Sequence, residues 1–287
     1  MIKLNPNVKK ELKNKTILVT GGGGSIGSHL IKRLLDYPIK TVRALDIDEH
    51  ALFKLKRSND DPRLRLLLGS ILDKDRITMA CNNIDIIIHT AAIKNIEISE
   101  FNPIETIDTN VNGTVNLIKI ATELKPEKLL NISTDKAVES TTLYGTTKQL
   151  SERLVSWAGI HIPDTKFGTI RFGNVFETRG NVFEVWKEEA EKNDSLTITD
   201  PSMKRYFFSI EEAVSFILES LTMINRGEIF IPKMREYSLK KLANKISSNH
   251  NIIGLRKGEK IAEKLIDKNE IKHAVEKKNM WIIHVND

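Results

Sequence analysis

Tyr144 and Lys148 form the first pair of side chains whose types and spacing suggest chemistry. They lie at positions i and i+4 of a predicted helix, so both face the same side and the ammonium can approach the phenol. A nearby cation stabilises a phenolate and is expected to lower the tyrosine pKa toward neutrality. The pair could therefore move a proton or hold the ribose of a cofactor. Because this spacing is common by chance, its meaning depends on the elements around it.

A second acid and amine, Asp135 and Lys136, lie in the segment Ser-Thr-Asp-Lys-Ala at 133–137, which ends a predicted strand. A simple dehydrogenase or epimerase needs only a hydroxyl at this place beside the tyrosine and lysine. Hydride transfer combined with elimination needs two proton-transfer pairs. The segment therefore favours a reaction with an elimination step. A salt bridge on the surface is the alternative interpretation.

A glycine cluster, Thr-Gly-Gly-Gly-Gly-Ser-Ile-Gly at 20–27, follows the first predicted strand and opens the first helix. Gly21 permits a tight turn, Gly24 lets a pyrophosphate approach the helix N-terminus, and Gly27 lets the helix pack close to the sheet. The pattern predicts a dinucleotide site.

Asp46 ends the second predicted strand, about 20 residues after the last glycine, where an acid accepts both ribose hydroxyls of adenosine. Its charge repels a 2′-phosphate, and the next residues, Ile47-Asp48-Glu49, offer no arginine to bind one. The sequence therefore favours NAD over NADP.

The elements that must position these residues alternate between apolar strands and amphipathic helices in the first half of the chain. Such alternation predicts an α/β fold, a Rossmann doubly wound parallel sheet covered on both faces. The expected strands are 16–19, 42–46, 64–68, 84–90, 129–133 and 167–172. The expected helices begin with one that carries Ile26, Leu30 and Leu34 on one face and continue with 50–57, 73–81, 104–124 and 144–158.

The second half of the chain has a less regular pattern, which predicts a smaller α/β substrate domain over the carboxyl edge of the sheet. We expect the Rossmann domain to cover 1–173, with segments around 205–225 returning to it, and the smaller interleaved domain to cover 174–287. Its expected elements are helices 182–190 and 210–224, strands 196–199 and 228–231, the segment 239–246, and a charged tail.

Composition excludes several other classes of protein. The 287 residues include 40 % hydrophobic and 29 % charged residues, as in ordinary globular proteins. The 44 basic and 38 acidic residues leave a net charge of +6, but the lysines are scattered rather than clustered as in a nucleic-acid binder. The densest basic run, 9–15, is expected to be solvated. The seven histidines lack metal-site spacing, so no metal is expected.

The expected location is the cytoplasm. Cys81 is the single cysteine, which excludes an internal disulfide and fits a reducing compartment. The first residues lack the apolar core of a secretory signal. The longest strongly apolar stretch, 84–93, is far shorter than the ~20 residues of a membrane helix.

Seven segments spread along most of the chain resemble extended short-chain dehydrogenases of the nucleotide-sugar 4,6-dehydratase group. They are most similar to soluble UDP-N-acetylglucosamine 4,6-dehydratases (5-inverting) of the polysaccharide biosynthesis family. The segments are 20–30, 89–114, 133–148, 171–182, 198–218, 227–234 and 252–260. The Ser-Thr-Asp-Lys-Ala segment is the most specific, because glucose-type dehydratases carry Asp-Glu where this chain has Asp135-Lys136.

The resemblance implies a role for each catalytic residue. Tyr144, supported by Lys148, takes the proton of the sugar C4 hydroxyl, and Thr134 hydrogen-bonds the C4 oxygen. Lys136 removes the C5 proton and Asp135 protonates the leaving C6 hydroxyl. The hydride passes from C4 to NAD and returns to C6, so the cofactor is regenerated and is expected to stay bound.

Two further residue sets follow from the same resemblance. The cofactor is expected to contact Gly21, Gly24, Ser25, Ile26, Gly27, Asp46, Ser70, Ile71, Ala91, Ala92, Lys94, Tyr144 and Lys148. The nucleotide-sugar is expected to contact Lys94, Asn174, Arg179, Gly180, Asn181, Val182, Arg205, Arg256 and Glu259. In this set Arg205 and Arg256 would meet the diphosphate, although they could be surface cations, and 179–181 would form a uridine-side loop. Asn110 is expected to be structural or to hold a water molecule.

Departures from the group's pattern leave alternatives open. Soluble relatives carry Ser-Arg, which suits NADP, where this chain has Asp46-Ile47, and Ser70 replaces an adenine-contacting aspartate. The long membrane-bound relatives carry methionine where Tyr144 stands. The alternatives to UDP-N-acetylglucosamine dehydration are a UDP-N-acetylhexosamine 4-epimerase, a dehydratase of a GDP-linked sugar, and a non-catalytic protein that senses NAD. The C5 stereochemical outcome stays open.

The helices 104–124 and 144–158 carry more apolar positions than one buried stripe needs. Relatives pair these helices into a four-helix interface, so we expect a homodimer or a higher homo-oligomer. The positions concerned are Ile107, Val111, Val115, Ile118, Leu150, Leu154 and Trp157.

Overall fold

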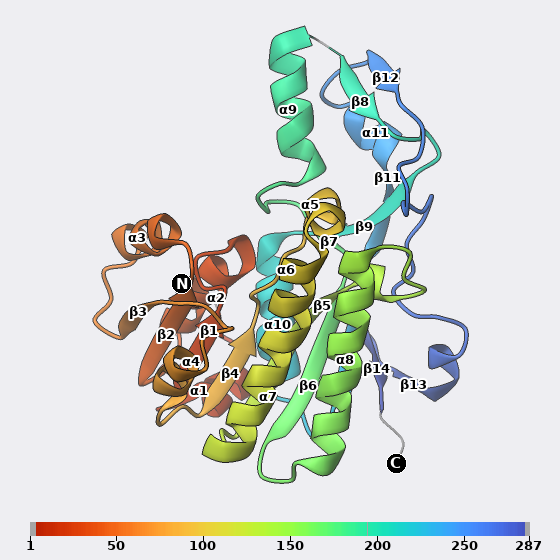
Figure 1. The fold of residues 1–287 in the computed structure, drawn as a ribbon. Coiled ribbons are helices and arrows are strands. Elements are labelled where there is room, and N and C mark those ends of the chain that lie inside the picture. The colour runs from red at the N-terminus through yellow and green to blue at the C-terminus, as the bar shows by residue number, and fades with distance from the viewer. Residues whose placement is uncertain (1–3, 194, 285–287) are drawn as a thin grey trace.

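A computed structural model describes residues 4–193 and 195–284. Within these residues the main body is a nine-stranded sheet in the order β13-β14-β10-β6-β5-β4-β1-β2-β3 (Figure 1). The strands from β3 to β10 run parallel, and β14 and β13 are antiparallel additions. Their bounds are β1 (Thr16–Thr20), β2 (Thr41–Asp46), β3 (Leu64–Leu68), β4 (Ile86–His89), β5 (Lys128–Thr134), β6 (Lys166–Phe172), β10 (Glu228–Pro232), β13 (Ala274–Glu276) and β14 (Met280–Ile283).

The strand order reverses at the neighbouring strands β1 and β4. From β1 the chain continues to β2 and β3 at one edge of the sheet, and from β4 it continues to β5 and β6 toward the other edge. A crevice for a ligand opens outside the carboxyl ends of the strands at such a point. The six strands expected in the first half all occur, each with ends within two residues of the expected ones. The prediction of a parallel Rossmann sheet is therefore confirmed.

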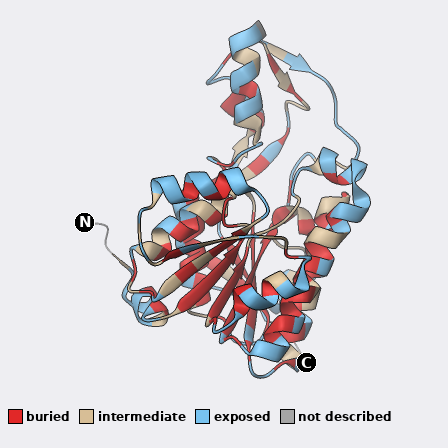
Figure 2. Ribbon diagram, turned by 60° about the vertical axis from the view of Figure 1, so that its left-hand side comes forward, coloured by how far each residue is buried: buried red, intermediate tan, exposed pale blue. Residues whose placement is uncertain are grey.

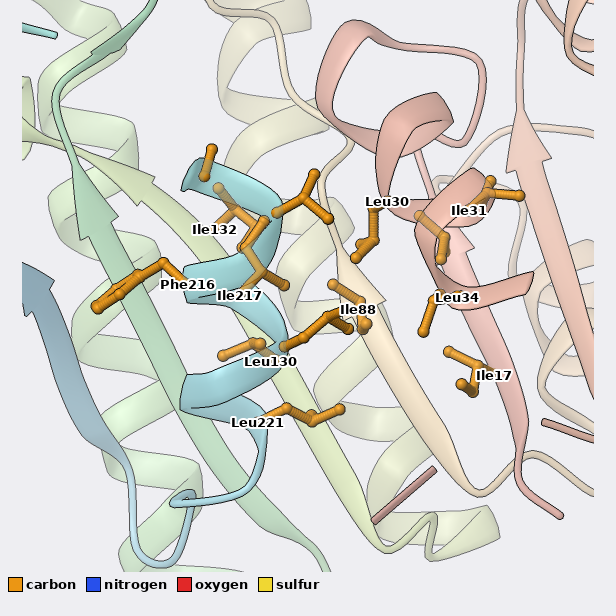
Figure 3. Packing of buried hydrophobic residues seen from close by; sticks show 14 of the residues in the cluster. Ile17, Leu30, Ile31, Leu34, Ile88, Leu130, Ile132, Phe216, Ile217 and Leu221 are labelled. Carbon is orange, nitrogen blue, oxygen red and sulfur yellow. The ribbon is translucent and has the colours of Figure 1, made fainter. Parts of the chain in front are cut away.

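Helices cover both faces of the sheet (Figure 2). One face packs against α1 (Pro6–Leu12), α2 (Ser25–Leu35), α3 (Glu49–Ser58) and α10 (Ile210–Leu221). The other packs against α4 (Lys74–Cys81), α7 (Gly113–Leu124) and α8 (Leu143–His161). Figure 3 shows Phe216, Ile217 and Leu221 of α10 meeting Leu130 and Ile132 of the sheet. The glycine-rich loop and the start of α8 are thereby fixed to a rigid body.

The expected helix at 104–124 contains a turn that periodicity did not predict. The chain forms α6 (Pro103–Ile107), a π-helical turn η1 (Asp108–Asn112), and then α7. Asn110 lies in this turn and is fully buried. Its carbonyl oxygen accepts from the hydroxyls of Thr114 and Ser151, and its side chain bonds both backbone groups of Ile93. Asn110 therefore fastens the loop after β4 to α8.

A smaller lobe rises over the carboxyl edge of the main sheet (Figure 1). It contains a three-stranded sheet, β11-β9-β7, a two-stranded sheet, β12-β8, and two helices. Trp186, Leu196 and Phe207 are among the residues of its separate core. The bounds are β7 (Asn174–Val175), α9 (Val182–Asn193), β8 (Leu196–Ile198), β9 (Lys204–Phe208), β11 (Arg235–Ser238), α11 (Leu239–Ala243) and β12 (His250–Ile252).

Segments that return to the main body extend beyond 205–225. Strand β10 pairs with β6, and the charged tail supplies β13 and β14, where Met280 and Ile282 are buried. The basic run near the N-terminus overlaps α1, whose Val8 and Leu12 are also buried. Strand β10 was expected at 228–231, whereas α1 and β14 each bury only a few apolar residues beside lysines and β13 buries none, so the sequence pattern did not predict these three. A further short helix, α5 (Ile96–Phe101), precedes α6.

None of the helices in the described part of the chain is long and apolar enough to cross a membrane. Across the same residues, no group of three or more His, Cys, Asp or Glu side chains is placed to hold a metal ion. Cys81 is buried with a free thiol, and burial raises its pKa to about 12.

Candidate active site

A cavity of about 830 Å³ lies between the carboxyl ends of the main sheet and the smaller lobe. It receives side chains from regions far apart in the sequence, between Ile26 and Glu263. Fifteen of the residues expected to act on cofactor or substrate line it. They are Ile26, Ala92, Lys94, Thr134, Lys136, Tyr144, Lys148, Asn174, Arg179, Gly180, Asn181, Val182, Arg205, Arg256 and Glu259.

Helix α8 begins at the cavity wall and positions Tyr144 and Lys148 in its first turns. The Thr142 hydroxyl caps this helix by accepting the Gly145 N–H at 3.2 Å, and the Glu100 carboxylate accepts the Leu143 N–H at 2.8 Å. Burial lowers the pKa of Lys148 to about 8, and the carboxylate of Glu152 partly opposes that shift. Lys148 is thus a buried amine that can change charge near neutral pH.

The pKa of Tyr144 is raised, which corrects the expectation that Lys148 would lower it. Burial of the phenol is the largest cause, and the carboxylate of Asp135 raises the pKa further. A hydrogen bond with Thr134 acts in the opposite direction. The charge that shifts the pKa of the phenol is therefore the anion Asp135 rather than the expected cation, so the phenol keeps its proton in this arrangement.

Asp135 and Lys136 begin a short 3₁₀ turn, η2 (Asp135–Ala137), directly after β5. The Asp135 Oδ1 atom accepts from Lys136 Nζ and from the Thr134 hydroxyl, each at 3.0 Å. Because Asp135 is fully buried, the alternative of a surface salt bridge is wrong. Its Oδ2 atom has no hydrogen-bond partner among the described residues. Lys136 and Thr134 face the cavity, and Asp135 lies behind them.

A buried ion network, formed by Arg171, Glu152 and Glu270, lies next to the part of α8 that carries Lys148. Arg171 in β6 donates to both carboxylate oxygens of Glu152, at 3.0 and 2.6 Å. The same guanidinium donates to both carboxylate oxygens of Glu270 in the C-terminal segment, at 2.8 and 2.7 Å. Glu152 lies one helical turn after Lys148 on α8. The network therefore connects the sheet, α8 and the tail beside the buried amine.

The glycine-rich loop has the shape that a dinucleotide requires. Gly21 has φ +68°, and a Cβ there would stand 2.7 Å from the Ala91 nitrogen. A Cβ at Gly27 would stand 2.2 Å from the Gly21 oxygen, so α2 crosses the loop at backbone contact. The free N–H groups at the start of α2 then face the crevice, where they can bind a pyrophosphate. These residues fit a dinucleotide cofactor.

Asp46 lies at the end of β2 beside this loop. Its Oδ2 accepts the Gly23 N–H at 2.8 Å, and its Oδ1 accepts the Asp48 N–H at 3.0 Å. The side chain of Ile47 is 74 % exposed and offers no charge. The carboxylate is thereby fixed next to the loop that would hold the adenosine half of a dinucleotide.

Other expected cofactor residues lie around the same loop but do not line the cavity. The Ser25 hydroxyl, at the N-terminus of α2, accepts the Arg179 N–H. The Ser70 hydroxyl accepts the Leu72 N–H in a local turn, and Ile71 is buried in the core against α7. Ala91 packs against Gly21, and Gly24 stands at the N-cap of α2. The Ser70 and Ile71 side chains thus have local structural contacts.

The substrate side of the cavity is cationic, but several of its residues are engaged in the protein's own contacts. Arg205 donates to the carbonyls of Lys204, Ile261 and Lys260, at 2.7, 3.0 and 2.9 Å. Arg256 is exposed, and its guanidinium makes no hydrogen bond to the described residues. The Glu259 carboxylate accepts the Arg256 N–H at 3.0 Å. Arg256 is therefore the more available partner for a diphosphate.

The expected uridine-side loop has a structural role as well. The Asn181 side chain caps α9 by accepting the N–H groups of Phe183 and Glu184, at 3.0 and 3.1 Å. Gly180 has φ +72° and donates its N–H to Glu184. Asn174 donates its amide to the Tyr206 carbonyl at 3.1 Å. Val182 begins the helix and lines the cavity.

Four charged residues that line the cavity, Glu97, Glu189, Lys260 and Glu263, were missed from the sequence, and the last two lie together. Lys260 donates to the Val138 carbonyl at 2.7 Å and pairs with the buried Glu263 at 3.3 Å. Both follow the Gly258-Glu259 pair that the resemblance picked out. A lysine and a glutamate at positions i and i+3 predict an ion pair on an exposed helix surface. Only the fold shows that Lys260 and Glu263 face the cavity.

The sequence of the chain is similar to a protein family and to several known proteins. A family model described as "Polysaccharide biosynthesis protein" matches residues 17–285. An uncharacterized membrane protein of Methanocaldococcus jannaschii is 40 % identical over 95 % of this chain and 86 % of its own length. A UDP-N-acetylglucosamine 4,6-dehydratase (inverting) of Campylobacter jejuni is 37 % identical over 94 % of this chain and 82 % of its own. A UDP-glucose 4-epimerase of Rickettsia bellii is 32 % identical over 94 % and 83 %.

The fold of the chain is also similar to those of solved structures. The X-ray structure of Pen from Bacillus thuringiensis matches with a TM-score of 0.91 and 33 % identity, covering 95 % of this chain and 89 % of that one. The NAD-bound dTDP-glucose 4,6-dehydratase of Streptomyces venezuelae matches with a TM-score of 0.81, covering 90 % of each chain, at 22 % identity. The second likeness concerns the fold alone.

Proposed function

Since the chain belongs to the polysaccharide biosynthesis protein family, we propose that it is a nucleotide-sugar 4,6-dehydratase that acts on UDP-N-acetylglucosamine. The observation that carries this proposal is the meeting of two proton-transfer pairs at one cavity wall. Lys136, Thr134, Tyr144 and Lys148 face the cavity, and Asp135 lies directly behind Lys136 and Thr134. Two such pairs match the demands of a reaction that combines hydride transfer with elimination.

The cationic side of the cavity would bind the substrate's diphosphate. Arg256 offers a guanidinium fork, which suits phosphate oxygens, and Lys94 lines the same cavity. This binding would place the hexose against the wall formed by Thr134, Lys136 and Tyr144.

Oxidation at C4 would begin at Tyr144. In its phenolate form Tyr144 would take the proton of the C4 hydroxyl, and Thr134 would hold the C4 oxygen. A nicotinamide dinucleotide held by the glycine-rich loop and Asp46 would supply the reversible hydride transfer that oxidation at C4 and reduction at C6 require. Because burial and Asp135 raise the pKa of Tyr144, the phenol needs added positive charge nearby to act as a base. Lys148, when protonated, can supply this charge, because it lies one helical turn after Tyr144 on α8.

Elimination would follow at C5 and C6. The C4 ketone acidifies the C5 proton, and Lys136 in its neutral form removes it. Asp135, when protonated, supplies the proton with which the C6 hydroxyl leaves as water. As Asp135 is buried, this proton would reach the cavity through the hydroxyl of Thr134, its hydrogen-bond partner at the cavity wall. The final protonation at C5 can occur on the opposite face, which gives C5 inversion.

Incubation of the purified protein with UDP-N-acetylglucosamine tests the proposal. We expect a UDP-4-keto-6-deoxy-hexosamine, lighter than the substrate by one water molecule, identified by mass and NMR. UDP-glucose and a GDP-linked hexose run in parallel test the base and the sugar. Unchanged mass with all three substrates would contradict dehydration.

Epimerisation at C4 is the second candidate, because the Rickettsia relative that bears this name covers most of the chain. It would use the same cavity, Tyr144 and Lys148, and it would leave Asp135 and Lys136 without a role. NMR separates the two reactions, since an epimerase gives a product of the same mass with inverted C4.

For the cofactor we propose tightly bound NAD rather than NADP. The Asp46 carboxylate is held beside the glycine-rich loop and would repel a 2′-phosphate. We predict that denatured protein releases mainly NAD(H). The double variant Asp46→Ser/Ile47→Arg is expected to shift the preference toward NADP, measured as the ratio of dissociation constants for the two cofactors. Recovery of mainly NADP from the unmodified protein would refute the role of Asp46.

We also propose a homodimer through α7 and α8 and a location in the cytoplasm. Ile107 at the end of α6 and Leu150 and Trp157 on α8 are exposed, which supports the interface, whereas Val111 and Ile118 are buried within the single chain. The buried free thiol of Cys81 suits a reducing compartment. The Methanocaldococcus relative is named a membrane protein, so cell fractionation is the appropriate test of location.

A further inference from the structure

The loop that joins β7 to α9 reaches from the smaller lobe to the glycine-rich loop of the main body. Arg179, in this loop, makes three hydrogen bonds across the gap. Its N–H donates to the Ser25 hydroxyl at 2.9 Å, and its Nη2 donates to the Gly23 carbonyl at 2.6 Å. Its own carbonyl accepts from Lys94 Nζ at 2.9 Å. Arg179 therefore joins the two walls of the crevice at the glycine-rich loop.

The loop is held in this shape by bonds that do not involve the crevice. The Thr178 hydroxyl donates to the Val175 carbonyl at 3.1 Å, and the Glu177 carboxylate accepts the Ile210 N–H of α10 at 2.9 Å. On the other side, Asn181 caps α9. Arg179 thus sits on a short span with fixed ends, which aims its guanidinium at residues 23–25.

The charges at this place suit an anion. Lys94 and Arg179 stand together, and the pKa of Lys94 is lowered by burial and by the charge of Arg179, with Glu184 opposing. Both cations lie by the N-terminus of α2, whose free N–H groups and dipole also favour negative charge. In a dinucleotide site of this type, the pyrophosphate lies on that helix N-terminus.

We propose that Arg179 binds the pyrophosphate of the dinucleotide cofactor and closes the crevice over it. This inference rests on the proposed use of a dinucleotide, and it differs from the uridine-side role that the resemblance implied. A guanidinium fork can donate to a phosphate oxygen and keep a bond to the loop. The cofactor then leaves only when residues 176–181 move off the glycine-rich loop. Such retention suits an enzyme that regenerates its cofactor in every turnover.

The test measures cofactor release without any nucleotide-sugar present. Protein loaded with radiolabelled NAD is diluted into excess unlabelled NAD, and the loss of label is followed over time. Removal of one charge-assisted contact is expected to speed release by about 10- to 100-fold in Arg179→Ala. Arg179→Lys keeps the charge but loses the two-pronged geometry of the guanidinium. Its rate of NAD release is therefore expected to lie between those of the unmodified protein and Arg179→Ala.

Arg256→Ala is the matched control, because it removes a guanidinium from the same cavity away from the glycine-rich loop. We expect it to weaken UDP binding in calorimetry and to leave NAD release unchanged. Arg179→Ala is expected to show the opposite pattern. Melting temperatures with and without NAD identify any variant that fails to fold, and Arg179→Lys then carries the comparison.

Two results would overturn the inference. One is an unchanged rate of NAD release in both Arg179 variants. The other is a loss of UDP affinity in Arg179→Ala without a change in NAD release, which would restore the uridine-side role. A protein that binds no dinucleotide at all would instead refute the proposed function, so the two failures can be told apart.

Discussion

At the scale of residues, Thr134 connects the two proton-transfer pairs. Its hydroxyl donates to Asp135 Oδ1 at 3.0 Å and is hydrogen-bonded to Tyr144. The bond with Thr134 lowers the pKa of Tyr144, so it is one in which the Thr134 hydroxyl donates to the phenol oxygen. Because a hydroxyl carries one proton, Thr134 donates either to Tyr144 or to Asp135 at a time. Thr134 therefore stands between the tyrosine on one side and the Asp135–Lys136 ion pair on the other. The steps assigned to these two sides can be separated by substitution.

Tyr144→Phe is expected to abolish every step, because oxidation at C4 needs the phenol to take a proton. Lys136→Ala is expected to stop the reaction after oxidation, since no base remains for the C5 proton. Stopped-flow absorbance would then show reduced nicotinamide accumulating in Lys136→Ala and not in Tyr144→Phe. Deuterium from solvent would enter C5 only in the unmodified enzyme.

Near-normal turnover by Lys136→Ala would remove the elimination role of this lysine and leave the epimerase candidate standing. Lys136→Arg serves as a companion variant, because it keeps a cation beside Asp135 but cannot act as a base near neutral pH. Loss of C5 exchange in both variants would assign the effect to the base rather than to the ion pair.

The pH dependence should report on Lys148 and its neighbours. Burial lowers its pKa to about 8, and the Glu152 carboxylate raises it. The other titratable groups that interact with it include His89, whose pKa burial lowers to about 3, so it stays neutral. If ammonium is the active form, kcat/KM falls as pH rises through this pKa. In Glu152→Gln the opposing anion is gone, so the alkaline limb is expected to move to lower pH.

Glu270→Gln is the matched control for this shift. It removes a carboxylate from the same Arg171, but from the side away from α8. We expect both variants to lower the melting temperature, because each weakens a buried ion network. Only Glu152→Gln is expected to move the pH profile. An equal shift in both would mean that the network acts through packing and not through the charge of Glu152.

At the scale of elements, the end of β6 determines where Asp135 can lie. A Cβ on Gly173, just after β6, would stand 2.7 Å from the Tyr206 Cβ and 3.1 Å from Asp135 Oδ2. Tyr206 belongs to β9 and is fixed by pairing with β11. We predict that Gly173→Ala displaces the Asp135 carboxylate and lowers turnover by about tenfold or more, with a stability loss of about 1–3 kcal/mol.

Gly168→Ala on the same strand is the control for Gly173→Ala. Its Cβ would meet only the side chain of Ile224, at 3.0 to 3.4 Å, far from the cavity. It is expected to cost stability without a selective loss of dehydration. Steady-state kinetics and thermal melting of both variants check this, and equal turnover in the two would count against the placement of Asp135.

Sequence predicted the strands of the first half well, both in the fully buried centre of the sheet and at its partly exposed edge. The expected strand 129–133 lies inside the buried β5, and 64–68 coincides with the edge strand β3. It could not predict the π turn at Asn110, because that turn depends on hydroxyls from Ser151 on another helix. Strand β14 was missed for a similar reason, since its pairing with β10 joins residues distant in sequence.

The site was predictable in its residue types but less so in its contacts. Tyr144, Lys148 and Lys136 meet in the cavity because the topology places the ends of β5 and the start of α8 together. Asn181 could have been read as a helix cap, because an Asn before a helical run is a common N-terminal signal. The contacts of Arg179 with 23–25 cross between lobes, and no local pattern encodes them.

At the scale of the whole molecule, exposed apolar side chains gather on α6 and α8, two helices that contact each other. Ile104 of α6 is 69 % exposed, Trp157 of α8 is 51 % exposed, and Ile107 and Leu150 are also exposed. The other faces of α7 and α8 are buried against the sheet, so these exposed side chains contribute nothing to that core. Exposed apolar surface of this kind is typical of an interface.

A homodimer that pairs α7 and α8 with their copies is the assembly we predict for this surface. Leu150→Glu and Trp157→Glu place a charge where the dimer would exclude water, so each is expected to give monomers in sedimentation equilibrium at micromolar concentration. Both side chains are about half exposed in the single chain, so its fold is expected to survive, as circular dichroism would show. Phe53→Glu is the control, because Phe53 is 56 % exposed on α3, which covers the other face of the sheet. It is expected to stay dimeric. A monomeric unmodified protein, or dissociation caused equally by Phe53→Glu, would contradict this interface.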